Sequence, residues 1–75
     1  MTTAAHKNRN VYRYEGKASD ISGANIHYAP VIRFWVLCVQ RGRNFDKDMF
    51  FDSFEEAYAA MQSIGRFALE ASYDN

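Results

Sequence analysis

The stretch Val31–Gly42 (VIRFWVLCVQRG) limits the fold of this chain more than any other part of the sequence. It is rich in β-branched and aromatic residues, and alternate residues of a strand point to opposite faces of a sheet. One alternate set is Ile32, Phe34, Val36 and Cys38, and the other is Val31, Arg33, Trp35, Leu37, Val39 and Arg41. Both sets are largely apolar, which is typical of a strand that is buried on both faces. The pattern therefore predicts the central strand of a sheet.

Two further strands are predicted around this one. Asn10–Gly16 (NVYRYEG) alternates, with Tyr12 and Tyr14 on one face, and ends at a glycine. Arg41–Asn44 is a turn in which Gly42 can take a positive φ, and Phe45–Phe51 then returns antiparallel as the second arm of a hairpin. Lys17–Pro30 is dense in Ser, Gly, Asn and Asp, which indicates a loop.

A helix begins after the hairpin. Ser53 followed by Glu56 is a capping box, in which the hydroxyl and the carboxylate satisfy free N–H groups at the helix start. Acidic residues at this end also favour the helix dipole. Apolar residues recur at helical spacing at Ala57, Met61, Ile64 and Ala68. Gly65 interrupts the pattern, and 66–73 is interpreted as a further turn or a second short helix.

These elements predict an α+β fold: a three-stranded antiparallel sheet with a C-terminal helix packed on one face, in the order β-loop-β-β-α. With 75 residues, one domain over 10–75 is expected, after a flexible N-terminal tail over 1–9. The helix is expected to cover the face that carries Phe34 and Val36. The face with Trp35 and Leu37 would then stay uncovered, and uncovered apolar surface usually indicates a partner.

Composition narrows the class of protein. The chain has one cysteine, which favours a reducing compartment, so we expect a cytoplasmic protein. No stretch reaches the length of a membrane span, and the N-terminus lacks the apolar segment of a signal peptide. Net charge is zero, yet seven of the nine basic residues precede Asn44 and seven of the nine acidic ones follow Arg43. A basic side and an acidic side are therefore expected.

No pattern in the sequence indicates catalysis. His6, His27 and Cys38 lack the paired spacing of a metal site, and no third group accompanies a Cys–His pair. Phosphate-binding loops and nucleophile motifs are missing as well. We expect no enzyme, no catalytic residue, no metal, no cofactor and no small-molecule substrate.

Nucleic acid is one candidate ligand. Arginines interleave with aromatic residues along the predicted sheet, and these residue types supply phosphate contacts and base stacking. The candidate contacts are Arg13, Arg33, Trp35, Arg41 and Arg43.

A family resemblance supports this alternative. Five parts of the sequence carry it, namely Tyr28, Val31, Trp35–Val39, Gly42–Arg43 and Phe51–Ala60. In these parts the chain resembles AP2-type and phage-integrase arm-binding domains. Those domains are three-stranded sheets followed by one helix, and they bind DNA through Arg and Trp on the sheet. The resemblance implies DNA contacts by Arg33, Trp35, Arg41 and Arg43.

A protein partner is the interpretation that we favour, because a dedicated nucleic-acid domain is usually net basic. In size and architecture the chain is similar to small phage inhibitors such as anti-CRISPR proteins, which occupy a surface of a host protein, with carboxylates standing in for phosphates. The predicted carboxylates are Asp46, Asp48, Asp52, Glu55 and Glu56, and the predicted aromatic anchors are Trp35, Tyr12, Phe45 and Tyr58. A homodimer that pairs two sheet faces or two strand edges is the alternative within this hypothesis.

Overall fold

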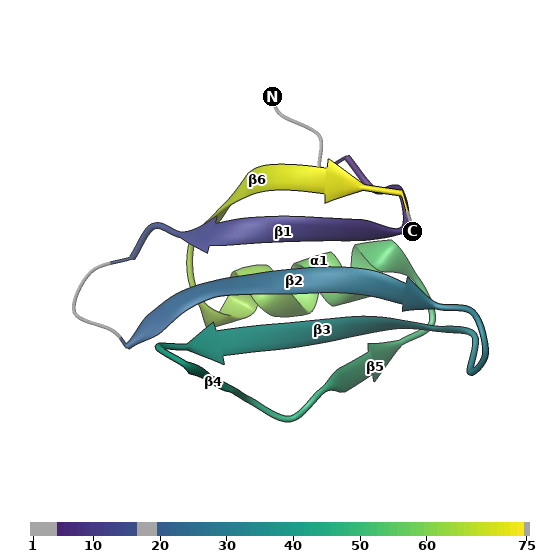
Figure 1. The fold of residues 1–75 in the computed structure, drawn as a ribbon, viewed down its shortest axis with the longest axis horizontal. Helices are drawn as coiled ribbons and strands as arrows, with labels where there is room; N and C mark the ends of the chain where they lie inside the picture. Colours follow the sequence, from purple (N-terminus) through teal and green to yellow (C-terminus); the bar gives the residue numbers. More distant parts are fainter. Residues whose placement is uncertain (1–4, 17–19, 75) are drawn as a thin grey trace.

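A computed structural model describes residues 5–16 and 20–74 (Figure 1). Within these residues the chain forms six strands and one helix, in an order that ends with a strand. The elements are β1 (Arg9–Tyr14), β2 (Ile21–Ala29), β3 (Phe34–Arg41), β4 (Asn44–Phe45), β5 (Met49–Phe51), α1 (Phe54–Ile64) and β6 (Phe67–Tyr73). All strand pairs are antiparallel, and the sheet order is β4-β3-β2-β1-β6. β5 also pairs with β3, beyond the end of β4, so that β4 and β5 share one edge of the sheet.

The predicted α+β class is correct, but the predicted three-stranded sheet with a C-terminal helix is wrong. The helix is followed by β6, which pairs with β1 at the opposite edge of the sheet from β5. α1 lies behind the middle of the sheet, roughly along β2 in this view, and the chain then continues to the opposite edge in β6 (Figure 1). α1 leaves the other face of the sheet without a covering element among the described residues.

Part of the predicted loop over 17–30 is the strand β2. The described part of that stretch alternates, with Ala24 and Ile26 buried at 5% and 0% exposure. Gly23 lies where β1 and β2 approach closely, since a Cβ at this position would come within 2.7 Å of the Tyr12 carbonyl oxygen. The small polar residues that indicated a loop therefore serve strand pairing, in which a glycine permits close backbone approach.

The predicted helical continuation over 66–73 is the strand β6. Phe67 is 5% exposed and packs against Tyr14, with ring centroids 5.2 Å apart. Six residue pairs join β6 to β1 across a β-bulge. Without β6, the N–H and C=O groups on that side of β1 would form a free strand edge. Tertiary pairing thus overrides the helix propensity of Ala68, Leu69 and Glu70.

The predicted central strand and its hairpin turn are confirmed. β3 has β2 on one side and β4 and β5 on the other. Gly42 follows it with a φ of 60°, the conformation that glycine adopts at low cost. Before β3, the chain turns through residues 30–33, where Arg33 has a φ of 61° and its N–H donates to the Ala29 carbonyl at 2.8 Å.

The predicted helix start is also confirmed. The Glu56 N–H donates to the Ser53 hydroxyl at 3.1 Å, and the Asp52 N–H donates to the Glu56 carboxylate at 3.3 Å. The buried side of α1 is formed by Phe54, Ala57 and Met61. Ile64, predicted in the buried stripe, is 38% exposed at the end of the helix.

The assignment of the two sheet faces is reversed relative to the prediction. Trp35 packs against Phe54 of α1, and Leu37 and Val39 are fully buried in the core beneath the helix. Phe34, Val36 and Cys38 therefore lie on the other face. Ile32 precedes the strand and is 49% exposed in the turn. Because both alternate sets of β3 are apolar, alternation alone could not show which set the helix covers.

Candidate interaction surface

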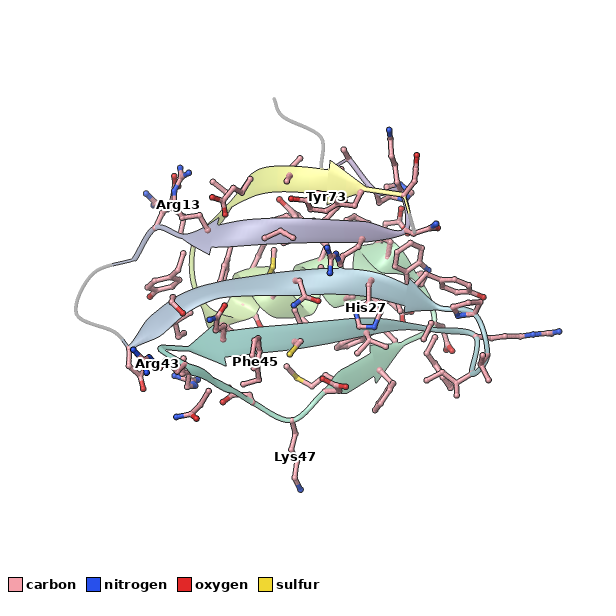
Figure 2. The ribbon with its side chains drawn as sticks, viewed as in Figure 1. Arg13, His27, Arg43, Phe45, Lys47 and Tyr73 are labelled. Carbon is pink, nitrogen blue, oxygen red and sulfur yellow. The ribbon has the colours of Figure 1, made fainter. Side chains whose placement is uncertain are left out.

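The sheet face opposite α1 is the candidate site, and we call it the uncovered face. Figure 2 shows side chains along the strands in the view in which the sheet lies in front of the helix. The strand register places its residues in three cross-strand rows. The first row is Tyr73, Arg9, His27, Val36 and Phe50, the second is Ala71, Val11, Asn25 and Cys38, and the third is Ala68, Arg13, Gly23, Gln40 and Phe45.

One half of the uncovered face is apolar and carries exposed rings. We call it the phenylalanine half, and its members are Phe34, Val36, Phe45 and Phe50. Phe34 and Phe50 meet edge to face with ring centroids 6.1 Å apart, and they are 37% and 52% exposed. Val36, in the same row as Phe50, is only 2% exposed although no helix covers it. Phe45 is 59% exposed at the other end of this half.

The other half of the uncovered face is indented, and we call it the hollow half. A hollow of about 210 Å³ lies over β6, β1 and β2 and reaches Gln40 of β3. Its lining includes Arg9, Val11, Gly23, Asn25, Glu70 and Tyr73. The Arg9 guanidinium lies 4.9 Å from the centre of the Tyr73 ring, a cation–π contact at the rim. Gly23 and Ala24 of β2 are the small apolar residues of this lining.

Three of the four predicted aromatic anchors lie on the helix side of the sheet, where Tyr12 and Tyr58 have ring centroids 5.9 Å apart. Tyr12 is 2% exposed in the core, and burial raises its pKa from 10.0 to about 12. Trp35 is half-buried on the helix side, with its ring near Phe54 and Tyr28. Tyr58 is half-buried and stacks on Phe54. Phe45 is the one predicted anchor that lies on the uncovered face.

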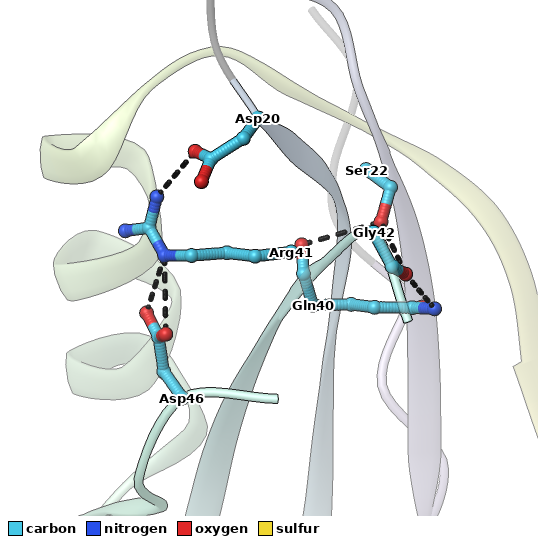
Figure 3. A network of polar contacts seen from close by, with 6 residues as sticks. All are labelled: Asp20, Ser22, Gln40, Arg41, Gly42 and Asp46. Carbon is cyan, nitrogen blue, oxygen red and sulfur yellow. Dashed lines mark hydrogen bonds and ion pairs between the residues drawn. The ribbon is translucent and has the colours of Figure 1, made fainter. Parts of the chain in front are cut away.

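The predicted carboxylates have different local roles. Asp46 accepts two hydrogen bonds from the Arg41 Nε at 3.1 and 2.9 Å, while Arg41 Nη1 donates to Asp20 at 2.8 Å (Figure 3). Asp46 and Asp20 together raise the pKa of the Arg41 guanidinium. Glu56 caps the helix. Asp48 lies near Cys38, whereas Asp52 and Glu55 are exposed at the start of α1. Of the five carboxylates predicted to stand in for phosphates, Asp46 is therefore neutralised by an arginine.

The arginines predicted to bind nucleic acid are dispersed. Arg13 is paired with Glu15 at 3.1 Å, and Arg41 is held between two carboxylates. Arg33 lies in the turn before β3, and Arg43 follows Gly42 in the hairpin turn. Trp35 faces the helix side, away from the uncovered face. The set does not form one contact surface.

The sequence-based prediction missed the residues that do lie together. Arg9 was assigned to the tail, His27 to a loop and Tyr73 to a helix, yet the register places all three in one row. The alternation of Ala24, Ile26 and Tyr28 was a signal that could have identified β2. If β2 had been predicted, His27 would have been assigned to a strand of the sheet.

The nucleophile and metal candidates do not assemble into a reactive group. Burial, with a smaller effect of Asp48, raises the pKa of the Cys38 thiol, so the reactive thiolate is disfavoured. His6 stacks on Phe54, with ring centroids 4.4 Å apart, and His27 lies beside Asn25. Across residues 5–16 and 20–74, no three His, Cys, Asp or Glu side chains come together as metal ligands could.

Comparison with known proteins assigns the chain to no family. No family model, no curated protein and no solved structure that was compared with the chain matches it. In the part of the chain that the structure describes, no helix is long and apolar enough to cross a membrane.

Proposed function

We propose that this protein is a non-enzymatic protein-binding module, with the uncovered face of its sheet as the binding surface. The phenylalanine half carries the proposal. Phe34 and Phe50 present exposed ring surface around the buried Val36, on a face that no described element covers. Large rings supply much of the energy of protein interfaces because each buries a large apolar area with few rotatable bonds.

The size of the face supports this proposal. The molecule measures 36 × 30 × 20 Å, and the uncovered face is viewed along the shortest of these axes. Stable complexes bury about 800 Å² on each partner, which a face of these dimensions can provide. The mixture of exposed rings and polar rim residues is also the usual anatomy of an interface.

The role that we propose is that of an inhibitor, which acts by occupying a surface of another protein in the cytoplasm. Small phage inhibitors of the anti-CRISPR type, which the chain resembles in size, act in this way. The exposed rings of Phe34 and Phe50 support a contact on the uncovered face in place of the helix start and its carboxylates. We therefore expect ring substitutions, rather than charge reversal at Glu55, to weaken the complex most.

The test is affinity capture from a bacterial lysate with three immobilised proteins: the natural chain, Phe50→Glu and Ile64→Glu. Ile64 is an apolar residue of α1 with 38% exposure, so its variant controls for adding a charge at an exposed apolar site. We expect a protein that the natural chain and Ile64→Glu retain and that Phe50→Glu loses. Circular dichroism checks that all three are folded. Identical retention by all three proteins would contradict the proposed surface.

A further inference from the structure

The two edges of the sheet differ in how they are protected. The edge formed by β4 and β5 is broken, because these strands have two and three residues and the charged stretch 46–48 separates them. Short strands and charges discourage another strand from pairing at an edge. The edge formed by β6 is continuous over Phe67–Tyr73, contains no lysine or proline, and among the described residues β6 pairs only with β1 (Figure 1). The β6 edge is therefore open to a further strand.

The backbone groups that face this open edge belong to alternate residues of β6. The Arg66 carbonyl accepts a hydrogen bond from the Glu15 N–H at 2.9 Å, so the register directs the backbone groups of Arg66 and Ala68 toward β1. In an antiparallel pair, the residues in between direct both their N–H and their C=O to the opposite side. Phe67 and Leu69 therefore present these groups at the open edge. Leu69 is also 36% exposed, whereas Phe67 is buried.

We propose that two copies of this chain form a dimer by antiparallel pairing of their β6 strands, with the two-fold axis at Ala68. In this register Ala68 lies opposite the same residue of the second copy, and Phe67 lies opposite Leu69 of the second copy. Phe67 and Leu69 of both copies then exchange backbone hydrogen bonds across the axis. The exposed Leu69 side chain gains an aromatic neighbour on the helix side of the sheet.

Charge favours this register over its alternatives. Glu70 lines the hollow of the uncovered face, the face on which Ala68 also lies by register, and alternation places Arg66 there too. Both are exposed, and among the described residues neither belongs to an ion pair. An axis at Ala68 places Arg66 opposite Glu70 of the second copy, and this pair occurs twice. An axis at Glu70 would instead place two carboxylates opposite each other, which is unfavourable.

This dimer goes beyond the proposed function and leaves its surface accessible. The axis lies at the β6 edge, whereas Phe34 and Phe50 lie on or beside β3 and β5, near the opposite edge of the sheet. Edge pairing joins the two sheets into one, with both helices on one side and both uncovered faces on the other. The dimer would thus present the proposed binding surface twice on the same side.

The first test is the molar mass in solution, measured by light scattering over a wide range of concentrations. We expect a species of twice the 8.7 kDa mass of the chain. Glu70→Arg and Arg66→Glu should each weaken association about tenfold, because each turns both ion pairs into like-charge pairs. An equimolar mixture of these two variants should associate like the natural chain, since every charge then meets its opposite. Phe50→Glu, near the other edge, should also associate like the natural chain.

The second test locates the axis by a disulfide in a Cys38→Ser background. Ala68 would form a pair without backbone hydrogen bonds, in which the two Cα atoms lie about 4.5 Å apart. This distance suits a disulfide, which joins Cα atoms about 4.4–6.8 Å apart. We expect Ala68→Cys to give a covalent dimer under mild oxidation. Ala71→Cys is the matched control, a half-buried alanine of the same strand whose two copies would lie far from the axis, and it should stay monomeric on a non-reducing gel.

The remaining outcomes are decisive once circular dichroism shows that each variant is folded. A chain that stays monomeric at every concentration, or a dimer that Glu70→Arg leaves intact, would overturn the β6 pairing. A disulfide from Ala71→Cys in place of Ala68→Cys would overturn the proposed axis. Failure of the dimer leaves the proposed function in place if Phe50→Glu still loses a captured lysate protein. A dimer whose captured proteins are unaffected by Phe50→Glu would remove the proposed function and leave the dimer.

Discussion

The Ser72 hydroxyl donates a hydrogen bond to the side-chain oxygen of Asn10 at 2.8 Å, across 62 positions of sequence. Asn10 is 1% exposed, and its amide nitrogen donates in turn to the Tyr12 hydroxyl at 2.8 Å. This chain of hydrogen bonds joins β6 to β1 inside the molecule. It satisfies buried polar groups that would otherwise destabilise the fold.

Asn10→Ala should therefore lower the free energy of unfolding by about 1–3 kcal/mol, because two hydroxyl groups lose their partner at a buried site. Urea unfolding followed by Trp35 fluorescence measures the change. Ser22→Ala is the control, since its exposed hydroxyl bonds only to the Gln40 and Gly42 carbonyls, and it should cost less than about 0.5 kcal/mol. Equal effects of the two changes would argue against a stabilising role of the Asn10 network.

Because Tyr12 is buried, the free energy of unfolding should fall at high pH. Its pKa rises from 10.0 to about 12 through burial. Below pH 10 the phenol is protonated in both states. Between pH 10 and 12 the unfolded chain loses this proton while the folded protein keeps it, so the free energy of unfolding falls by about 2–3 kcal/mol as the pH rises.

Urea unfolding at a series of pH values from 9 to about 12 measures whether the free energy of unfolding decreases as expected for a buried phenol. Tyr12→Phe should lack this part of the decrease. Tyr73→Phe removes an exposed phenol instead and should retain it. A decrease that is the same in both variants would show that other groups cause it.

The sequence was sufficient to predict those features of the fold that depend on residues close together in the chain. The Ser53–Glu56 capping box and the Gly42 turn depend on neighbouring residues, and both are present as predicted. The strand β3 was predictable because its apolar residues are contiguous. Such features need no knowledge of the distant parts of the chain.

The parts that sequence reasoning missed depend on distant contacts. β6 contains good helix formers, and it is a strand because β1 offers an edge 53 or more positions earlier, at Tyr14 opposite Phe67. The side of β3 that meets α1 could not be decided from two apolar sets. The row of Arg9, His27 and Tyr73 on the candidate surface requires both β2 and β6, and although the alternation of Ala24, Ile26 and Tyr28 indicates β2, no local signal indicates β6.

Loss of the helix cap should be measurable. Ser53→Ala removes the hydroxyl that accepts from the Glu56 N–H, and about 1 kcal/mol of stability should be lost. Ser63→Ala, at an exposed position in the last turn of α1, is the matched control and should change stability by less than about 0.5 kcal/mol. Chemical denaturation of both variants gives the comparison. If Ser53→Ala behaved like Ser63→Ala, the cap would contribute nothing.

Two glycines should respond differently to alanine. Gly42 has a φ of 60° with no atom within 4 Å of an added Cβ, so Gly42→Ala should cost about 1–2 kcal/mol from backbone strain alone. Gly42→Asn should cost less, because asparagine tolerates this conformation. Gly23→Ala should be more harmful than either, since its Cβ would meet the Tyr12 carbonyl oxygen. The three unfolding midpoints test this order, and a Gly23→Ala variant as stable as the natural chain would contradict it.

Duplex DNA should bind poorly. Arg13 and Arg41 are paired with carboxylates, and Trp35 lies on the helix side of the sheet, so the contacts that the AP2-like resemblance implies do not lie together. Fluorescence anisotropy with a labelled duplex between about 50 and 200 mM salt measures the affinity and its salt dependence. Arg33→Ala and Arg43→Ala, which remove exposed cations at the two ends of β3, should leave the weak signal unchanged. Tight binding that salt weakens steeply, and that either variant reduces, would instead favour a DNA-binding function over the proposed protein interface.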